Sequence, residues 1–280
     1  MRVESLSQLG IGSQQKILTG SIDKTNRALG SVLEKLATGK RINKSKDDAA
    51  GLAIAEGLIT QTRGFKMALR NTEDGISALN IADGASNETS AILQRQRELA
   101  VQARNATLTD SDREALNKEF QQLTQEMDRI SDITNFNKQD LTNGQGLGDG
   151  NAQLQVGANE GETITTPAID ISVASIGMSG ADISSVNGAG SAIEAIDGAL
   201  NAVNRQRSDV GAMTNRLEST VSNLQTADVN TTAAQSIIRD QDMALGIAEM
   251  IKNQVLNRSG INVFSVFNKI SADHILGLIG

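Results

Sequence analysis

The 280-residue sequence contains no cysteine, tryptophan or tyrosine, and its single proline is Pro167. Without cysteine, the chain can form neither a disulfide framework nor a thiolate metal site. Aromatic residues make up 2% of the chain and are all phenylalanine, although a globular core of this size normally buries several aromatic rings. Long helices with narrow stripes of Leu, Ile, Val and Ala need almost none, so the composition favours them.

Features that mark other functional classes are also missing. No run of 18 apolar residues is present, so we expect no membrane span. The first residues, MRVESLSQLGIGSQQ, have no apolar core or A-x-A site, and no Sec-type signal is expected. No basic patch with interleaved aromatics suggests nucleic-acid binding. The single histidine, His274, has no catalytic constellation, so we expect neither an enzyme nor a cofactor.

The net charge of −7 is unevenly distributed. Between Asp132 and Asp197, nine acidic residues oppose one base, Lys138, which gives −8 and leaves +1 for the rest of the chain. Near-neutral ends can pack against copies of themselves, whereas an acidic middle suits a solvated outer surface.

Apolar spacing predicts helices in the first half of the chain. Residues 1–38 are weakly amphipathic, and a longer helical region follows from Ser45 to about Asn105. After a loop, Asp110 or Ser111 is expected to cap the next helix. Its apolar residues are spaced 4, 3, 4, 3, which is typical of a coiled-coil seam: Leu116, Phe120, Leu123, Met127 and Ile130.

The centre and the last third show different patterns. Residues 143–150 read as a turn-rich linker, residues 153–156 and 162–165 as a β-hairpin, and residues 169–173 as a further strand. A heptad pattern then returns from Ile193. The apolar positions of this pattern are 193, 196, 200, 203, 210, 217, 221 and 224, and the frame also passes through Arg207 and Thr214. A joint is expected at Asp228–Thr232, followed by a last helix from about Ala233 to Asn257.

Helices at both ends of the sequence can pair only if the chain folds back at its centre. We therefore predict a mainly α fold, a long antiparallel coiled-coil rod formed by the N- and C-terminal regions, with a small central β-hairpin.

The stretch Leu29–Leu58 is the most informative local pattern. A helix ends at Gly39, a basic turn containing Arg41, Ile42 and Asn43 follows, and Ser45 or Asp47 is expected to cap the next helix. The adjacent carboxylates Asp47 and Asp48 could in principle bind a metal or act as acid and base. At a helix start, capping and dipole stabilisation are the favoured interpretation.

Six blocks of the sequence resemble bacterial flagellins, in the order of that family. They are Arg41-Ile42-Asn43 with Lys46–Ile54, Arg70–Ser77, Leu93–Gln102 (LQRQRELAVQ), Gln155–Ile164, Arg207–Ala212 with Asn215–Leu217, and Ile238–Asp240 with Asp242–Ala244. The chain is similar to a short flagellin without large outer domains.

The resemblance implies a domain layout and a set of partners. Residues 1–45 with 234–280 would form the terminal coiled-coil domain, residues 46–166 with 191–233 the rod domain, and residues 167–190 a short variable surface loop. The chain would be exported unfolded through the flagellar type III apparatus with its chaperone. It would polymerise into the extracellular filament and meet hook-associated and cap proteins.

The resemblance also implies a surface patch. Arg95, Leu99 and Glu119 match residues that pack between subunits and are read by vertebrate Toll-like receptor 5. A hook-associated junction protein, or another secreted helical protein of the same export system, is the alternative.

Overall fold

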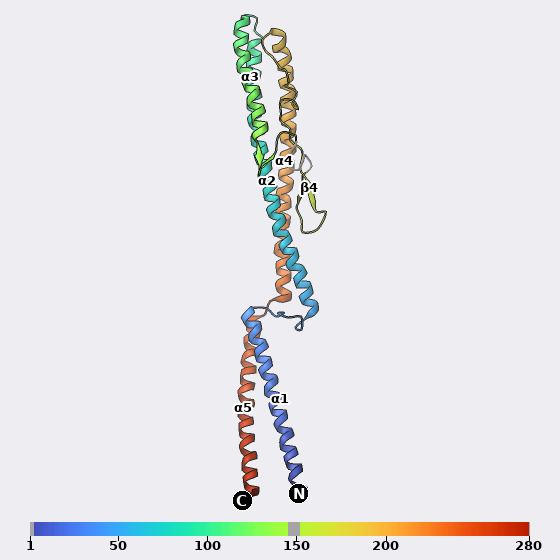
Figure 1. The fold of residues 1–280 in the computed structure, drawn as a ribbon, viewed down its shortest axis with the longest axis vertical. Coiled ribbons are helices and arrows are strands. Elements are labelled where there is room, and N and C mark those ends of the chain that lie inside the picture. Colours follow the sequence, from blue (N-terminus) through green and yellow to red (C-terminus); the bar gives the residue numbers. More distant parts are fainter. Residues whose placement is uncertain (1–2, 145–151, 280) are drawn as a thin grey trace. The chain divides into compact units, whose positions relative to one another are not determined.

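A computed structural model describes the backbone of residues 3–144 and 152–279. It describes the side chains of residues 12–144 and 152–270. The predicted linker at 143–150 therefore lies outside the described residues from 145 onward. The chain forms five helices and two small antiparallel strand pairs over these ranges (Figure 1). The elements are α1 (Val3–Thr38), α2 (Ala49–Ala103), α3 (Asp110–Ile133), β1 (Asn135–Phe136), β2 (Gln139–Asp140), β3 (Gln153–Gln155), β4 (Thr163–Thr165), α4 (Val186–Arg239) and α5 (Met243–Ile279). The predicted mainly α fold with a small β segment is confirmed.

The chain divides into two compact units. The terminal unit comprises Met1–Ile59 and Thr232–Gly280, and the central unit comprises Thr60–Thr231. The long helices α2 and α4 contribute residues to both units.

In the terminal unit, α1 and α5 pair side by side in antiparallel orientation (Figure 1). Two glycines of α5, fourteen residues apart, permit the close approach. A Cβ atom at Gly246 would lie 2.7 Å from Leu36, and one at Gly260 would lie 3.2 Å from Ile22. Leu36 and Ile22 are also fourteen residues apart, so the contacts repeat after two heptads.

The central unit is built around a hydrophobic core between α2, α3 and α4. Phe120 and Met127 of the predicted α3 seam are fully buried, as are Ile196, Val203 and Leu217 of the predicted α4 seam. The heptad assignments are therefore confirmed at these positions. Arg207, the charged residue in the α4 frame, pairs with Asp83 of α2 at 3.0 Å and so keeps its charge at the edge of the core.

Helix α3 begins one or two residues earlier than predicted. Thr109, rather than Asp110 or Ser111, is its N-cap, and Asp112 completes a capping box with it. The reciprocal bonds satisfy two backbone N–H groups of the helix start, which explains why Thr109 prevails.

The predicted β-hairpin is confirmed by the pairing of β3 with β4, in which Leu154 lies opposite Ile164. A second hairpin, β1–β2, was not predicted; it turns through Asn137 and Lys138, both with positive φ.

The expected strand at 169–173 is wrong. Asp170 makes only an isolated bridge with Asn143, and the alternation reflects burial of Ile169, Ile171 and Val173 in the core.

Residues 167–190 were expected to be a surface loop, and this is a further correction. Helix α4 already begins at Val186, and the connector, which we define as residues 167–185, is packed into the core. Its apolar side chains are buried in the main core: Ile169, Ile171, Val173, Ile176, Met178 and Ile183. Side chains of α3 bind its backbone. The Oδ1 of Asp128 accepts from the N–H of Val173 at 3.2 Å, and the Oδ1 of Asn117 accepts from the N–H of Ile183 at 3.1 Å. These bonds replace the ladder of a sheet and allow an irregular segment to be buried.

The joint expected at Asp228–Thr232 coincides with the boundary between the two units at Thr231–Thr232, but the expected end of a helix there is wrong. Helix α4 continues without a break to Arg239, and the chain leaves the helix only at Asp240–Asp242. Asn230 and Thr232 are exposed, so polar residues are tolerated at these two positions of the helix.

Candidate functional site

The signature turn, residues 39–48, is tied to the end of α4 by backbone hydrogen bonds. Gly39 ends α1 with a φ of 67°, in the left-handed region that favours glycine. The N–H of Arg41 donates to the carbonyl of Arg239 at 2.7 Å, and the N–H of Gln241 donates to the carbonyl of Gly39 at 2.9 Å. The guanidinium of Arg41 reaches the carbonyl of Ile238 at 2.7 Å. Arg41 therefore satisfies carbonyls that the end of α4 leaves without helical partners.

Ile42 and Asp48 connect this turn to α2. Ile42 is only 2% exposed, and a Cβ atom at Gly51 would lie 2.9 Å from its Cδ1, so glycine leaves room for this side chain. The Oδ1 of Asp48 accepts from the N–H of Gly51 at 2.9 Å. The cap of α2 is thus Asp48, which corrects the expectation of Ser45 or Asp47; α2 starts at Ala49 rather than at Ser45.

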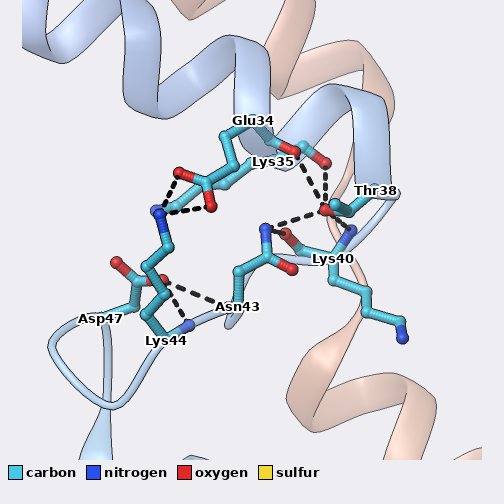
Figure 2. Close-up of polar contacts among 7 residues, drawn as sticks. All are labelled: Glu34, Lys35, Thr38, Lys40, Asn43, Lys44 and Asp47. Atoms are coloured by element: carbon cyan, nitrogen blue, oxygen red, sulfur yellow. Dashed lines mark hydrogen bonds and ion pairs between the residues drawn. The ribbon is translucent and has the colours of Figure 1, made fainter.

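Asp47 stabilises the turn itself (Figure 2). Its Oδ2 accepts from the backbone N–H groups of Lys44 at 3.0 Å and Asn43 at 3.1 Å. These two bonds, that from Lys44 first, lower the pKa of Asp47 below its ordinary value. The Nδ2 of Asn43 donates to Thr38 Oγ1 at 2.8 Å, and Lys44 pairs with Glu34 at 2.7 Å. Hydrogen bonding to Glu34 raises the pKa of Lys44.

The carboxylate of Asp47 therefore caps the turn, and the carboxylate of Asp48 caps the start of α2. Over the described residues, no group of three or more His, Asp or Glu side chains is arranged to hold a metal ion. This geometry agrees with the capping interpretation of Asp47 and Asp48.

The predicted patch on α2 and α3 is brought together only in part. The guanidinium of Arg95 pairs with Glu119 of α3 at 2.8 Å and with Glu98 at 2.9 Å, and the Glu119 bond is the main cause of the raised pKa of Arg95. Leu99, in contrast, is 1% exposed and belongs to the core. Residues four apart on a helix differ in direction by about 40°, enough here to turn Leu99 from the surface into the core. Its expected exposure beside Arg95 is wrong.

A surface that the sequence reading did not single out lies on α5. Ten large apolar side chains of this helix are exposed: Met243, Leu245, Ile247, Ile251, Val255, Leu256, Ile261, Val263, Val266 and Ile270. Together with the half-buried Met250, Phe264 and Phe267 they make α5 apolar on all sides, and this was the available signal, because such a helix is normally buried. Such an apolar surface marks a site of association. The helices of the described residues are nevertheless not apolar enough over a sufficient length to span a bilayer.

Comparison with known proteins places the chain in a family. Residues 13–146 match the family model for the bacterial flagellin N-terminal helical region, and residues 193–278 match that for the C-terminal helical region. A flagellin of Halalkalibacterium halodurans is 48% identical over 231 residues, which cover 81% of this chain and 83% of that protein. The flagellar filament 31.3 kDa core protein of Treponema maltophilum is 37% identical, covering 91% and 93%.

A solved structure supports the same family assignment. The crystal structure of Bacillus cereus flagellin, 33% identical, superposes with a TM-score of 0.50 and covers 59% of this chain and 94% of that one. The helical fold, the two matched regions and the relatives that cover most of the chain lead to one conclusion. The chain belongs to the bacterial flagellin family, and it is a structural subunit of the flagellar filament rather than an enzyme.

Proposed function

We propose that copies of this chain polymerise into the extracellular flagellar filament used for swimming, with the apolar surface of α5 as the main assembly surface. The observation that carries this proposal is the set of ten exposed apolar side chains on α5. Burying them against neighbouring copies removes apolar area from water, which is the dominant driving force of association. The terminal coiled-coil domain, residues 1–45 with 234–280, would line the central channel, and residues 46–166 with 191–233 would form the rod domain around it.

Export in an unfolded state through the type III apparatus is the second part of the proposal. The chain has no disulfide to reduce, because it has no cysteine. From residue 12 to 38 no side chain of α1 is buried, so little stability is lost when this helix unfolds. A flagellar export chaperone would cover the apolar α5 before assembly, and hook-associated and cap proteins would contact the ends of the polymer.

Electron microscopy of purified protein after seeding tests the filament proposal directly. We expect tubes that grow from the seeds and lengthen with protein concentration. One relative named above is a flagellin and another is a flagellar filament core protein, which favours this outcome over a hook-associated junction protein. A chain that only caps the seeds would contradict the proposal.

The isolated subunit should lose both ends to brief trypsin treatment. In α1 from residue 12 to 38 no side chain is buried, and in α5 from residue 243 to 270 only Gly246 is buried, so these helices are marginal without neighbours. We expect a resistant core that begins near Lys46 and ends near Arg239, and full-length protection in the polymer, measured by mass spectrometry. Equal resistance of the ends in subunit and polymer would contradict this.

We also propose that Arg95 and Glu119 form a surface used both for subunit packing and for recognition by Toll-like receptor 5 of a host. Support comes from the sequence resemblance and from the exposed ion pair between the two helices: the side chains are 51% and 44% exposed. Leu99 would contribute by packing below the pair rather than by direct contact.

Replacing Arg95 with alanine should weaken receptor signalling by the monomer and reduce polymerisation, each by about tenfold or more, if the pair is central to both interfaces. Monomer stability should change little, because exposed ion pairs contribute about 0–1 kcal/mol. Arg129→Ala is the matched control, since Arg129 is also exposed and paired with a carboxylate, Glu126. A variant of Arg95 that signals and assembles like the control would exclude the shared surface.

A further inference from the structure

Three cations form a stripe on α2 within the central unit. Arg63, Lys66 and Arg70 occupy positions i, i+3 and i+7, so they follow one another along one face over about 10 Å. All three side chains are exposed, and Met67 beside them is 52% exposed. From Gly57 to Thr72 the helix carries no acidic residue, and the next acids along it are Glu73 and Asp74, three and four residues after Arg70.

The stripe differs from five arginines of the central unit in having no ion-pair partner. Arg95, Arg97, Arg113, Arg129 and Arg207 each have a carboxylate oxygen within 4.0 Å. No such contact is found for Arg63, Lys66 or Arg70 among the side chains described in 12–144 and 152–270. Like charges three and four residues apart repel within a helix, so this arrangement is unfavourable in the isolated chain.

The neighbouring face of α2 is already occupied by the β3–β4 hairpin. A Cβ atom at Gly64 would lie 2.6 Å from the Cβ of Ala158, and one at Gly75 would lie 2.5 Å from Leu154. Asn71 donates to the carbonyl of Gln155 at 3.2 Å. The hairpin therefore anchors one face of the helix and leaves the stripe beside it open to another molecule.

The complementary charge is found in the middle of the same sequence. Between Asp132 and Asp197, nine acids oppose Lys138, and exposed carboxylates occur at Asp132, Glu160, Glu162, Asp182 and Glu194. A polymer raises the local concentration of such a surface around every copy, and opposite potentials favour its contact with the stripe.

We infer that Arg63, Lys66, Met67 and Arg70 form a subunit interface that binds the exposed carboxylates Asp132, Glu160 and Glu194 of a second copy. This inference rests on the proposed function and deepens it, because it names a second contact surface, distinct from the apolar α5. The cations supply orientation and register, and Met67 supplies a small apolar contact among them.

Charge reversal tests this interface. In a stripe variant with Arg63→Glu, Lys66→Glu and Arg70→Glu, we expect the critical concentration for seeded polymerisation to rise about tenfold or more, since attraction becomes repulsion. The matched control carries Arg104→Glu, Lys118→Glu and Arg205→Glu. These three residues are also exposed, and they also have no ion pair with the described residues. Both variants change the net charge equally, and only the stripe variant should fail to assemble at low ionic strength.

A partner variant identifies the acidic side of the contact. A chain with Asp132→Lys, Glu160→Lys and Glu194→Lys should assemble poorly alone but should co-assemble with the stripe variant. Circular dichroism melting of each monomer shows whether the variants fold; if the stripe variant does not, Arg63→Gln, Lys66→Gln and Arg70→Gln replaces it, with an expected rise of about threefold.

Several results would overturn the inference: normal assembly of the stripe variant, an equal loss in the matched control, or no co-assembly of the two complementary variants. The wild-type chain separates this inference from the proposed function. If the wild type itself forms no filaments, the proposed function fails, whereas filaments from both the wild type and the stripe variant contradict only the interface.

Discussion

Replacing Leu217 with alanine should lower the free energy of unfolding of the central unit by about 2–5 kcal/mol. Leu217 lies in the α4 seam, is fully buried and belongs to the main hydrophobic core. The truncation removes buried methyl groups and leaves a cavity that the packed helices can only partly close. Urea unfolding followed by circular dichroism measures the change as a lower midpoint with an unchanged slope.

Val229→Ala is the control for this substitution. Val229 lies on the same helix and in the same unit but is 67% exposed, so its truncation should change stability by less than about 0.5 kcal/mol. Equal midpoints for the two variants would mean that the heptad frame through residues 193–224 does not face the core in solution.

Placing acids on the apolar surface of α5 should abolish polymerisation. Ile251 and Val255 are 51% and 56% exposed in the single chain, so Ile251→Asp with Val255→Asp costs the isolated subunit little. Against neighbouring copies the same carboxylates would lose their water without gaining partners, which costs several kcal/mol. Sedimentation of seeded protein should find no polymer, while the melting of the central unit stays unchanged.

The control places the same charge on polar positions of the same helix. Gln254 and Ser259 are exposed, and Gln254→Asp with Ser259→Asp should retain seeded growth. Full polymerisation of the Ile251 and Val255 variant would exclude α5 as the main assembly surface. Loss of growth in both variants would show that added charge on α5 prevents assembly whether it replaces apolar or polar residues.

Patterns that depend on neighbouring residues could be read from the amino-acid sequence. Heptad spacing is local, so the burial of Phe120, Met127 and Leu217 followed from it. The β3–β4 hairpin followed from alternation on either side of a glycine-rich turn. The exposed apolar surface of α5 could also have been anticipated, because apolar residues lie on all sides of this helix.

Features that depend on which distant segment lies opposite required the folded chain. Residues 167–185 are rich in small and polar residues and resemble a surface loop, but Asn117, Gln121 and Asp128 of α3 satisfy their backbone and make burial possible. Arg95 and Leu99 are four residues apart, so the sequence alone places them on neighbouring parts of the same helix side. The positions of the adjacent helices decide that Leu99 enters the core and that Arg95 pairs with Glu119.

The turn at residues 39–48 shows both kinds of information in one place. Its composition alone indicated a helix end, a tight turn and a carboxylate cap. Which carboxylate caps which element depended on the path of the backbone: Asp48 bonds the start of α2, while Asp47 bonds the turn. The role of Arg41 depended on a segment almost 200 residues away, the end of α4, whose carbonyls have no other helical partner.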